Sequence, residues 1–569
     1  MGLTSSLQIG RSGLLTSQAA LQVAGNNLAN LTTEGYHRTD AKITAVRAHE
    51  IRNGVFIGQG VQLTAITRQV DEALEARLRG AVSDQSGSRV TQDLFSEIEA
   101  IENELSEVDV STRLATFFNA WSELANNPQD LSLRTLVVEE ATTLTDFIQS
   151  VRGEFGQMQK RIDDRLGNAV DNVNDLLDRI VELNRSIALQ EGGTSGEATG
   201  LRDQRDLYLT ELSEYIDFTT VEQNGGGIDI FIGSLPIVLG TQNRGLIAES
   251  QAVDGQITTA VRIAADNSPV DIQSGELGAL IRFRGNHLED AIDTLNTFSN
   301  TLIYEVNKIH STGQGLNLYD GIEGTNIVVD TTAALNTTAA GIAFTPNHGS
   351  FQFHVTQRST GQRMTQTIQV DLDGINPATD TSLTSLAADL NAVANVSATI
   401  TPDGRLSITP DSGDFQISFS DDSSGALAAL GVGAFFTGSD SFDIEVNTGL
   451  VGDPRLVAAA QGHLPGDNRN ALALSGLRDQ GIASLEGLSV TGYWNRHVED
   501  VSIRTAQARD QFQADSVVKE NLQVQQQAFS GVNADEETID LMSYQRMYQA
   551  NARFISVVDE LMQTLLTLV

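Results

Sequence analysis

The residues that could do chemistry in this chain are its histidines and its many carboxylates. None of the eight histidines has a second histidine four residues away, and no His-Glu-x-x-His sequence occurs. The helical zinc motif of metalloproteases is therefore absent, and His49 with Glu50 is only an isolated dipeptide. The chain also has no cysteine, which excludes disulfides, thiolate zinc ligands and cysteine nucleophiles.

The paired acids and the glycine runs do not form a recognisable site either. We interpret residues 163–164, two aspartates in a predicted helix, as solvated surface, and residues 421–422 as a plain loop, with weak calcium binding as the alternative. Residues 225–227 are three glycines that predict a turn between strands, and residues 431–433 lack the third glycine of a dinucleotide motif. We therefore predict no cofactor, no metal and no enzymatic activity.

The charge balance limits the possible partners. The 569 residues include 36 basic and 74 acidic ones, a formal net charge of −38. Such a chain lacks the basic face that nucleic acids require and is repelled by anionic membranes. No stretch approaches the ~18 apolar residues of a membrane span. The first 33 residues carry one charge, Arg11, and do not read as a cleavable signal peptide, so any route out of the cell would leave them intact.

The strongest hydrophobic periodicity lies at the two ends of the chain, where residues alternate at spacings of three and four. This spacing predicts coiled-coil helices. At the first end leucine occupies one core position, and small residues occupy much of the other. The first stripe is Leu3, Leu7, Gly10, Leu14, Ser17, Leu21, Ala24, Leu28 and Leu31, and the second is Leu541, Tyr544, Tyr548, Asn551, Ile555, Val558, Met562, Leu565 and Val569. We predict that the two helices pair and leave apolar surface for neighbouring subunits.

The interior of the chain changes from helical to β-rich. A long helix is predicted from a further stripe that runs from Ile162 to Ile187, and strand signals begin near residue 219. Residues 326–449 are rich in Thr, Ser and Gly, with a hairpin signal at residues 402–404.

We therefore expect an α+β multidomain protein with paired terminal helices, a long-helix bundle and an inserted β-rich domain. The terminal coiled-coil domain with an extended linker takes 1–68 and 531–569. The helical domain takes 69–325 and 450–530, with a small β excursion near 219–275, and the β-rich insert takes 326–449.

A motif near the first end carries a family resemblance. Residues 24–36 read AGNNLANLTTEGY, and this segment resembles the signature shared by flagellar rod, hook and hook-associated proteins. Near the other end, residues 542–552 read MSYQRMYQANA, which resembles the C-terminal motif of the same axial proteins. Gly35 also suits a left-handed turn on general grounds.

Three further segments are similar to the hook-associated protein 1 (FlgK) family in particular. They are FFNAW followed by LANNP at residues 117–128, LRDQRD at 201–206 with ELS at 211–213, and GDNRNALAL at 466–474. The resemblance covers roughly residues 1–320 and 450–569. The 326–449 insert is only loosely similar to a module of several axial proteins.

The resemblance implies a structural role and a set of partners. It implies export by the flagellar type III apparatus, an extracellular position, and self-assembly into a ring at the hook–filament junction. Hook protein would lie below the ring, a second junction protein above it, and an export chaperone would cover the C-terminal helix. The predicted assembly interface comprises Leu7, Leu14, Leu21, Leu28, Asn26, Asn27, Asn30, Gly35, Tyr36, Leu541, Tyr544, Tyr548, Asn551, Ile555, Val558, Met562 and Leu565.

Two other functions stay open at this point. One is another axial component, a hook or distal rod protein, against which residues 117–128 and 201–206 argue. The other is a secreted adhesin or enzyme on a flagellar scaffold, with its activity in the 326–449 insert.

Overall fold

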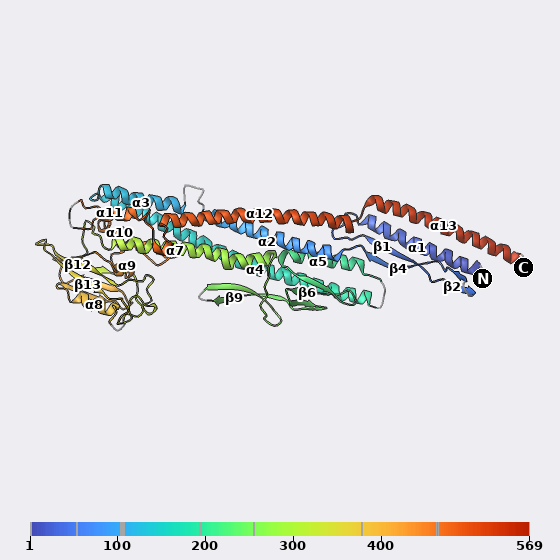
Figure 1. Ribbon diagram of the computed structural model, residues 1–569, viewed down its shortest axis with the longest axis horizontal. Coiled ribbons are helices and arrows are strands. Elements are labelled where there is room, and N and C mark those ends of the chain that lie inside the picture. The colour runs from blue at the N-terminus through green and yellow to red at the C-terminus, as the bar shows by residue number, and fades with distance from the viewer. Residues whose placement is uncertain are drawn as a thin grey trace. The chain divides into compact units, whose positions relative to one another are not determined.

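The computed structural model describes residues 3–52, 55–102, 109–192, 196–253, 256–376, 379–462, 464 and 466–567 (Figure 1). The chain divides into two compact units, which are described separately. The first unit takes residues 1–94, 161–285 and 506–569, and the second takes 95–160 and 286–505.

The first unit is built on the terminal helices and on long helices beside them. Its helices are α1 (Leu3–Ala29), α5 (Thr199–Tyr215), α6 (Gly275–Arg282) and α13 (Ala534–Thr567), with parts of α2 (Glu72–Glu102), α4 (Leu131–Glu191) and α12 (Val490–Ser530). Helices α1 and α13 lie side by side (Figure 1). Leu78, Ala81 and Val82 of α2 form a small buried cluster with Leu522 of α12. These contacts confirm that the terminal helices pair.

The strands of the first unit form small antiparallel sheets. They are β1 (Thr39–Ala45), β2 (His49–Arg52), β3 (Val55–Ile57), β4 (Val61–Arg68), β5 (Thr219–Glu222), β6 (Ile228–Ile232), β7 (Leu235–Leu239), β8 (Gln242–Asn243), β9 (Leu246–Val253) and β10 (Gln256–Ile263). Strand β1 pairs with β4, β2 with β3, and β9 with β10, while β5 to β8 form one four-stranded sheet. The predicted glycine turn joins β5 to β6, where Gly225 and Gly226 have positive φ.

The long-helix prediction is confirmed along α4. Every member of its stripe is buried, namely Ile162, Leu166, Ala169, Val173, Leu176, Ile180, Leu183 and Ile187. Asn184, on the same helix, holds the small β excursion, because its amide donates to Ile228 O and Gly240 O and accepts from Ile228 N. The apolar periodicity therefore places the helix, and one buried amide fixes the sheet on it.

The second unit has a helical part around two buried tryptophans. It contains α3 (Val110–Asn126), a π-helical turn (Phe283–Leu288) that leads into α7 (Glu289–His310), α10 (Thr448–Gly452), α11 (Arg469–Gly476) and parts of α2, α4 and α12. Trp121 of α3 packs against Phe435 with ring centroids 5.4 Å apart, and Trp494 of α12 packs against Phe298 at 5.3 Å. Aromatic pairs of this kind add to the stabilisation that burial alone provides.

The β-rich part of the second unit has its own hydrophobic core, which runs from Val328 to Val432. Its elements are β11 (Ile322–Glu323), β12 (Gly349–Gln357), β13 (Arg363–Val370), α8 (Leu383–Asn391), β14 (Val396–Ile400), β15 (Leu406–Pro410), β16 (Phe415–Ser420), α9 (Ala426–Ala429), β17 (Phe436–Thr437) and β18 (Glu445–Val446). The predicted hairpin is confirmed, since β14 pairs with β15 across a turn in which Gly404 has a φ of 89°.

Candidate functional site

The seam between α1 and α13 is made by small residues on α1 and large ones on α13. The residues that α1 buries are Gly10, Gly13, Thr16, Ser17, Ala20, Ala24 and Asn27. A Cβ added at Gly10 would lie 2.8 Å from Ile555 Cγ1, and one at Gly13 would lie 2.6 Å from Asn551 Oδ1. Both distances are below van der Waals contact, so the two helices approach closely only because these positions are glycine.

The predicted stripe on α1 is therefore partly wrong. Its small members Gly10, Ser17 and Ala24 are buried, but the leucines do not form the other core position. Leu7, Leu14 and Leu21 lie half-buried on the flank of the seam, and Leu28 is exposed. A second row of small residues takes the place that we expected leucine to fill, because the bulky side chains of α13 leave no room for leucine.

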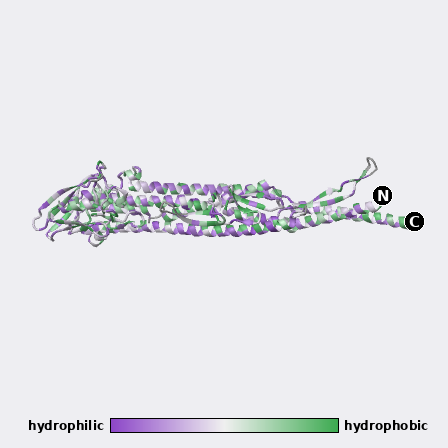
Figure 2. Cartoon of the chain, turned by 90° about the horizontal axis from the view of Figure 1, so that it is seen from below, coloured by the Kyte–Doolittle hydropathy of each residue, from purple (hydrophilic) through white to green (hydrophobic). Residues whose placement is uncertain are grey.

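The predicted stripe on α13 does face α1. Val558 is buried, and Leu565 is exposed. The half-buried members are Leu541, Tyr544, Tyr548, Asn551, Ile555 and Met562, and Val569 lies outside the described residues. Asn551 Nδ2 donates to Ser17 Oγ at 3.3 Å. Figure 2 shows that hydrophobic residues alternate with polar ones along these paired helices.

The asparagines after α1 organise the chain within this subunit. Asn27 is buried, and its amide donates to Thr39 O and Glu537 Oε2 and accepts from Thr39 N and the Tyr36 hydroxyl. Asn26 Nδ2 donates to the Tyr36 hydroxyl, and Asn30 Nδ2 donates back to Asn26 O. Gly35 has a φ of 73°, so the predicted left-handed turn is confirmed. These side chains turn the backbone from helix α1 into strand β1.

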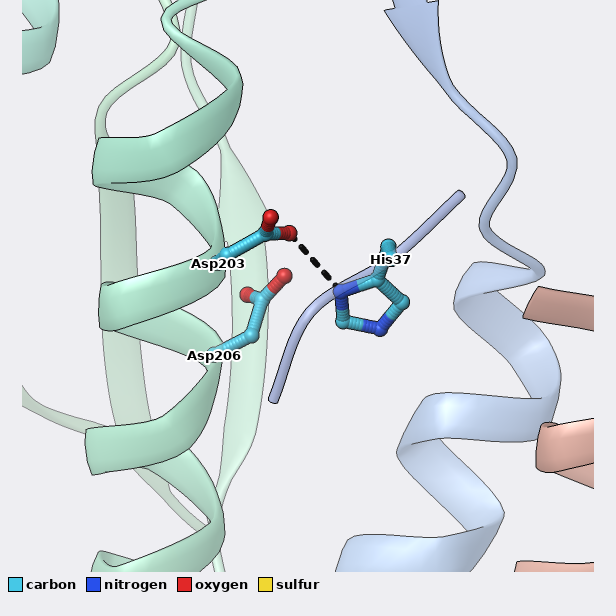
Figure 3. Close-up of side chains that lie close together, drawn as sticks. All are labelled: His37, Asp203 and Asp206. Atoms are coloured by element: carbon cyan, nitrogen blue, oxygen red, sulfur yellow. Dashed lines mark hydrogen bonds and ion pairs between the residues drawn. The ribbon is translucent and has the colours of Figure 1, made fainter. Parts of the chain in front are cut away.

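A cluster of buried charges lies directly after this turn, and we call it the His37 node; Figure 3 shows three of its members, His37, Asp203 and Asp206. Its members are His37, Arg68, Glu75, Asp203 and Asp206. His37 Nδ1 lies 2.8 Å from Asp203 Oδ1, and its Nε2 lies 3.6 Å from Glu75 Oε1. Arg68 Nη1 lies 2.9 Å from Asp203 and 2.6 Å from Asp206. The node thus joins the loop of residues 30–38 between α1 and β1, which we call the signature loop, and the end of β4 to α2 and α5.

The donor set of the node could in principle hold a metal, because ligand atoms of His37, Asp203 and Asp206 lie within 4.8 Å of one another. The guanidinium of Arg68, however, already contacts both aspartates. A positively charged group therefore occupies the position that a cation would need, and charge-assisted hydrogen bonds of this kind are among the strong ones. We interpret the node as a structural ion-pair network.

Arg38 extends this network to the C-terminal helix. Its guanidinium lies 3.0 Å from Glu536, 2.7 Å from Glu537 and 3.4 Å from Asp540. All three acids are in the first turns of α13, where carboxylates are favoured by the helix dipole. Arg38 N also donates to Ser530 O at the end of α12. The signature loop is thereby fixed to both C-terminal helices.

Burial would lower the pKa of His37, but its contacts with Asp203 and Glu75 outweigh that effect and raise the pKa to about 9. A His whose folded pKa lies above the unfolded value of about 6.5 contributes stability that is complete below pH 6.5 and is lost as pH rises through 9. We expect the wild-type chain to lose roughly 2–3 kcal/mol between pH 6.5 and 9.5 relative to His37→Gln.

Urea unfolding of both chains across this pH range is the measurement, and NMR of histidine-labelled protein gives the pKa directly. A His37 resonance that titrates near 6.5, with parallel stability curves for the two chains, would show that the ring is not held as a cation.

Sequence reasoning missed several of these residues and misplaced others. Nothing in the local pattern marked His37, Arg38 or Arg68, whose partners are distant in the chain. Only Asp203 and Asp206 had a signal, because they lie in the LRDQRD segment. A second heptad row, Gly13, Ala20 and Asn27, was visible beside the leucines and could have indicated the true seam.

Two interpretations of adjacent acids are also tested by the structure. Asp163 is not solvated surface, because Arg284 Nε donates to its Oδ1 at 2.7 Å, whereas Asp164 is exposed. Asp422 accepts hydrogen bonds from Ser424 N, Gly425 N and Leu427 N. The 421–422 pair thus belongs to a loop that caps the short helix α9.

The site as a whole joins two terminal segments and holds them against long helices. None of the described helices combines the length and the hydropathy that a membrane crossing requires. The chain matches the family models "Flagella basal body rod protein" over residues 7–37 and "Flagellar basal body rod FlgEFG protein C-terminal" over 525–568. Those are the two segments that form the terminal pair. The fold and the site thus define an axial protein of the bacterial flagellum.

Further comparisons indicate which axial proteins the chain is similar to. Residues 95–328 match the "Flagellar hook-associated protein FlgK helical domain". The chain is 25% identical to "Flagellar hook-associated protein 1" of Escherichia coli (strain K12), with 100% of both chains covered. It is 28% identical to the protein of that name from Bacillus subtilis (strain 168), over 39% of this chain and 45% of that one. The chain is thus similar over its full length to the flagellar hook-associated protein 1 (FlgK) family.

A solved structure supports the fold. The flagellar hook junction protein FlgK from Burkholderia pseudomallei matches with a TM-score of 0.50 and 16% identity, over 80% of this chain and 100% of that one. The family is structural and not enzymatic, as the motifs predicted. Its helical-domain match also separates the chain from the hook and distal rod proteins that the sequence left as alternatives.

Proposed function

We propose that this chain is a structural subunit of the hook–filament junction, on the extracellular flagellum. The observation that carries the proposal is the full-length similarity to flagellar hook-associated protein 1 together with the paired terminal helices. The protein does no chemistry in this role. It links two parts of an axial polymer through surfaces that a single copy leaves exposed.

The terminal pair provides such a surface. Its exposed apolar residues include Leu15, Leu28, Ile539, Met542, Met547, Phe554, Val557, Leu561, Leu565 and Leu566. An exposed apolar set of this extent is characteristic of an interaction site. The flanking leucines Leu7, Leu14 and Leu21 and the exposed Leu28 fit the same role, because α13 does not cover them fully.

We assign the predicted interface residues to two tasks. The α13 stripe apart from Leu565, with Asn26, Asn27, Asn30, Gly35 and Tyr36, holds the chain's own terminal segments together. The leucines of α1, with Leu565, face neighbouring subunits in a ring. Hook protein on one side, a second junction protein on the other, and an export chaperone on α13 before assembly are the partners that we propose.

We also propose the three-domain division, with 1–68 and 531–569 as the terminal domain, 69–325 and 450–530 as the helical domain, and 326–449 as the insert. The closed core from Val328 to Val432 supports the insert as a separate folding region. Phe435 and Phe436, which pack against Phe117, make its return to the helical domain.

A deletion strain tests the junction role. We expect cells without this chain to build hooks of normal length that carry no filaments, and to release filament protein into the medium. Electron microscopy of negatively stained cells gives the result, and expression of the intact chain from a plasmid is the control. Cells that lack hooks would instead indicate a hook or rod component, and normal filaments would remove the chain from the axis.

A further inference from the structure

The hairpin β2–β3 carries exposed apolar residues, and a groove borders the His37 node, whose His37, Glu75 and Asp206 are part of the groove's lining. Phe56 and Ile57 of β3 are both exposed large hydrophobic residues. Consecutive strand residues point to opposite faces, so exposure of both means that neither face of the hairpin is covered at this point. An exposed aromatic residue next to an exposed aliphatic one is typical of an anchor for a partner.

The groove lies in the same unit and has a volume of about 580 Å³. Its walls come from the signature loop, α2, α5 and the connection between α12 and α13. Apolar side chains in the lining are Leu31, Leu78, Leu207 and Val532, and the acidic ones are Glu34, Glu75 and Asp206. Leu31 is itself 43% exposed, so the groove offers apolar surface to an incoming side chain.

The charges of the two surfaces are complementary. Lys42 and Arg47, on the strand and turn that lead into the hairpin, are exposed basic residues, and Glu50 of β2 is an exposed acid beside them, in a chain where acids outnumber bases 74 to 36. In the groove Glu34 is an exposed acid, whereas Glu75 and Asp206 are engaged by His37 and Arg68. Opposite charges on two surfaces favour their encounter and fix their orientation.

The hairpin cannot reach the groove of its own chain. Strand β1 begins at Thr39, directly after His37, which lines the groove. The strands then lead away from the groove to the hairpin. Within the hairpin Phe56 pairs with Glu50, and Glu50 follows Thr39 by eleven residues. At about 3.3 Å per residue these eleven residues span up to roughly 35 Å, and Gly60, which follows the hairpin, lies against Ser12 of α1, about 27 Å along the helix from Asn30 at the groove. Its occupant must therefore come from another molecule.

We propose that Phe56 and Ile57 of one copy dock into the groove of residues 30–37, 207 and 532 on the next copy. Two different surfaces of the same chain then meet head to tail, and such heterologous contacts generate rings or helical polymers. This inference rests on the proposed function, since it names the contact by which one junction subunit would bind its neighbour.

Engineered cysteines test the contact, because the natural chain has none and every disulfide must come from the introduced pair. In assembled flagella, Phe56→Cys with Leu207→Cys should give interchain disulfide-linked multimers on mild oxidation. We expect a yield at least about tenfold above that of Phe56→Cys with Glu182→Cys, an exposed position on α4. The pair Ile57→Cys with Val532→Cys repeats the test if the first pair does not assemble.

If a double-cysteine variant assembles but cross-links no more than the control pair, the docking contact is wrong. The contact is also wrong if neither double variant assembles while each single-cysteine variant does. The junction role is judged separately, since variants that restore filaments to the deletion strain without cross-linking leave that role intact.

Discussion

Gly13→Leu should abolish the hook–filament junction while leaving most of the chain folded. A Cβ at this position would lie 2.6 Å from Asn551 Oδ1 and 2.8 Å from Asn551 Cγ, and leucine adds three further carbons. Overpacking of a tight seam costs about 1–3 kcal/mol, and more where neither side can move. The helices α1 and α13 would separate, whereas the core around Trp121 belongs to the second unit and is unaffected.

Gly25→Leu is the matched control. Gly25 lies on the same helix, and an added Cβ would meet nothing within 4 Å. In both variants leucine is a better helix former than glycine by about 1 kcal/mol, so any difference between them reports the seam. We expect no filaments on Gly13→Leu cells and normal filaments on Gly25→Leu cells, with hydrogen exchange of α1 and α13 accelerated only in the first. Filaments and slow exchange in Gly13→Leu would mean that the close approach is not required.

The second large effect is expected at Asp203. Both His37 and Arg68 contact its carboxylate, and all three side chains are at least nine-tenths buried. Asp203→Ala would leave two cations facing one another with only Asp206 and Glu75 to balance them. Removal of one partner of a buried ion pair typically costs about 3–5 kcal/mol. The loss should appear as a lower urea midpoint for the first unit.

Gln204→Ala is the control for this variant, because Gln204 is exposed on the same helix. The urea midpoint of Asp203→Asn should lie between those of Asp203→Ala and Gln204→Ala, since the amide oxygen still accepts a hydrogen bond but carries no charge. It should also lower the pKa of His37 from about 9, which separates an electrostatic role from mere packing. Equal urea midpoints for Asp203→Ala and Gln204→Ala would contradict the network.

The heptad pattern alone predicted the terminal pair but not its packing. On α13 the stripe from Leu541 to Met562 is the face that meets α1, although a second apolar row of the same spacing, Met547, Phe554 and Leu561, lies beside it. On α1 two rows share the same period, leucines at 7, 14 and 21 and small residues at 13, 20 and 27. Periodicity cannot choose between rows of equal spacing. The choice depends on Asn551 and Ile555, which lie more than 500 residues away.

The His37 node was beyond prediction for a related reason. His37 and Asp203 are 166 residues apart, and Arg68 and Asp206 are 138 apart. Each residue looks ordinary in its own segment, and only the three-dimensional fold brings the charges together. The family motif marked Asp203 as a residue of interest without indicating its partners.

The pairing of α1 with α13 also sets an order of events in folding. The hydrogen bond from Asn551 to Ser17 joins residues 534 apart, so its formation in an otherwise unfolded chain would close a very long loop. The entropy of that closure costs roughly 5–6 kcal/mol. Once the His37 node and the Arg38 contacts have formed, the C-terminal end of α1 and the N-terminal end of α13 are already adjacent. Pairing of the two helices then closes only a short loop, so most of this entropic cost no longer applies. The terminal helices should therefore pair last, and their pairing should begin at Asn27 and Glu537 and proceed toward the chain ends.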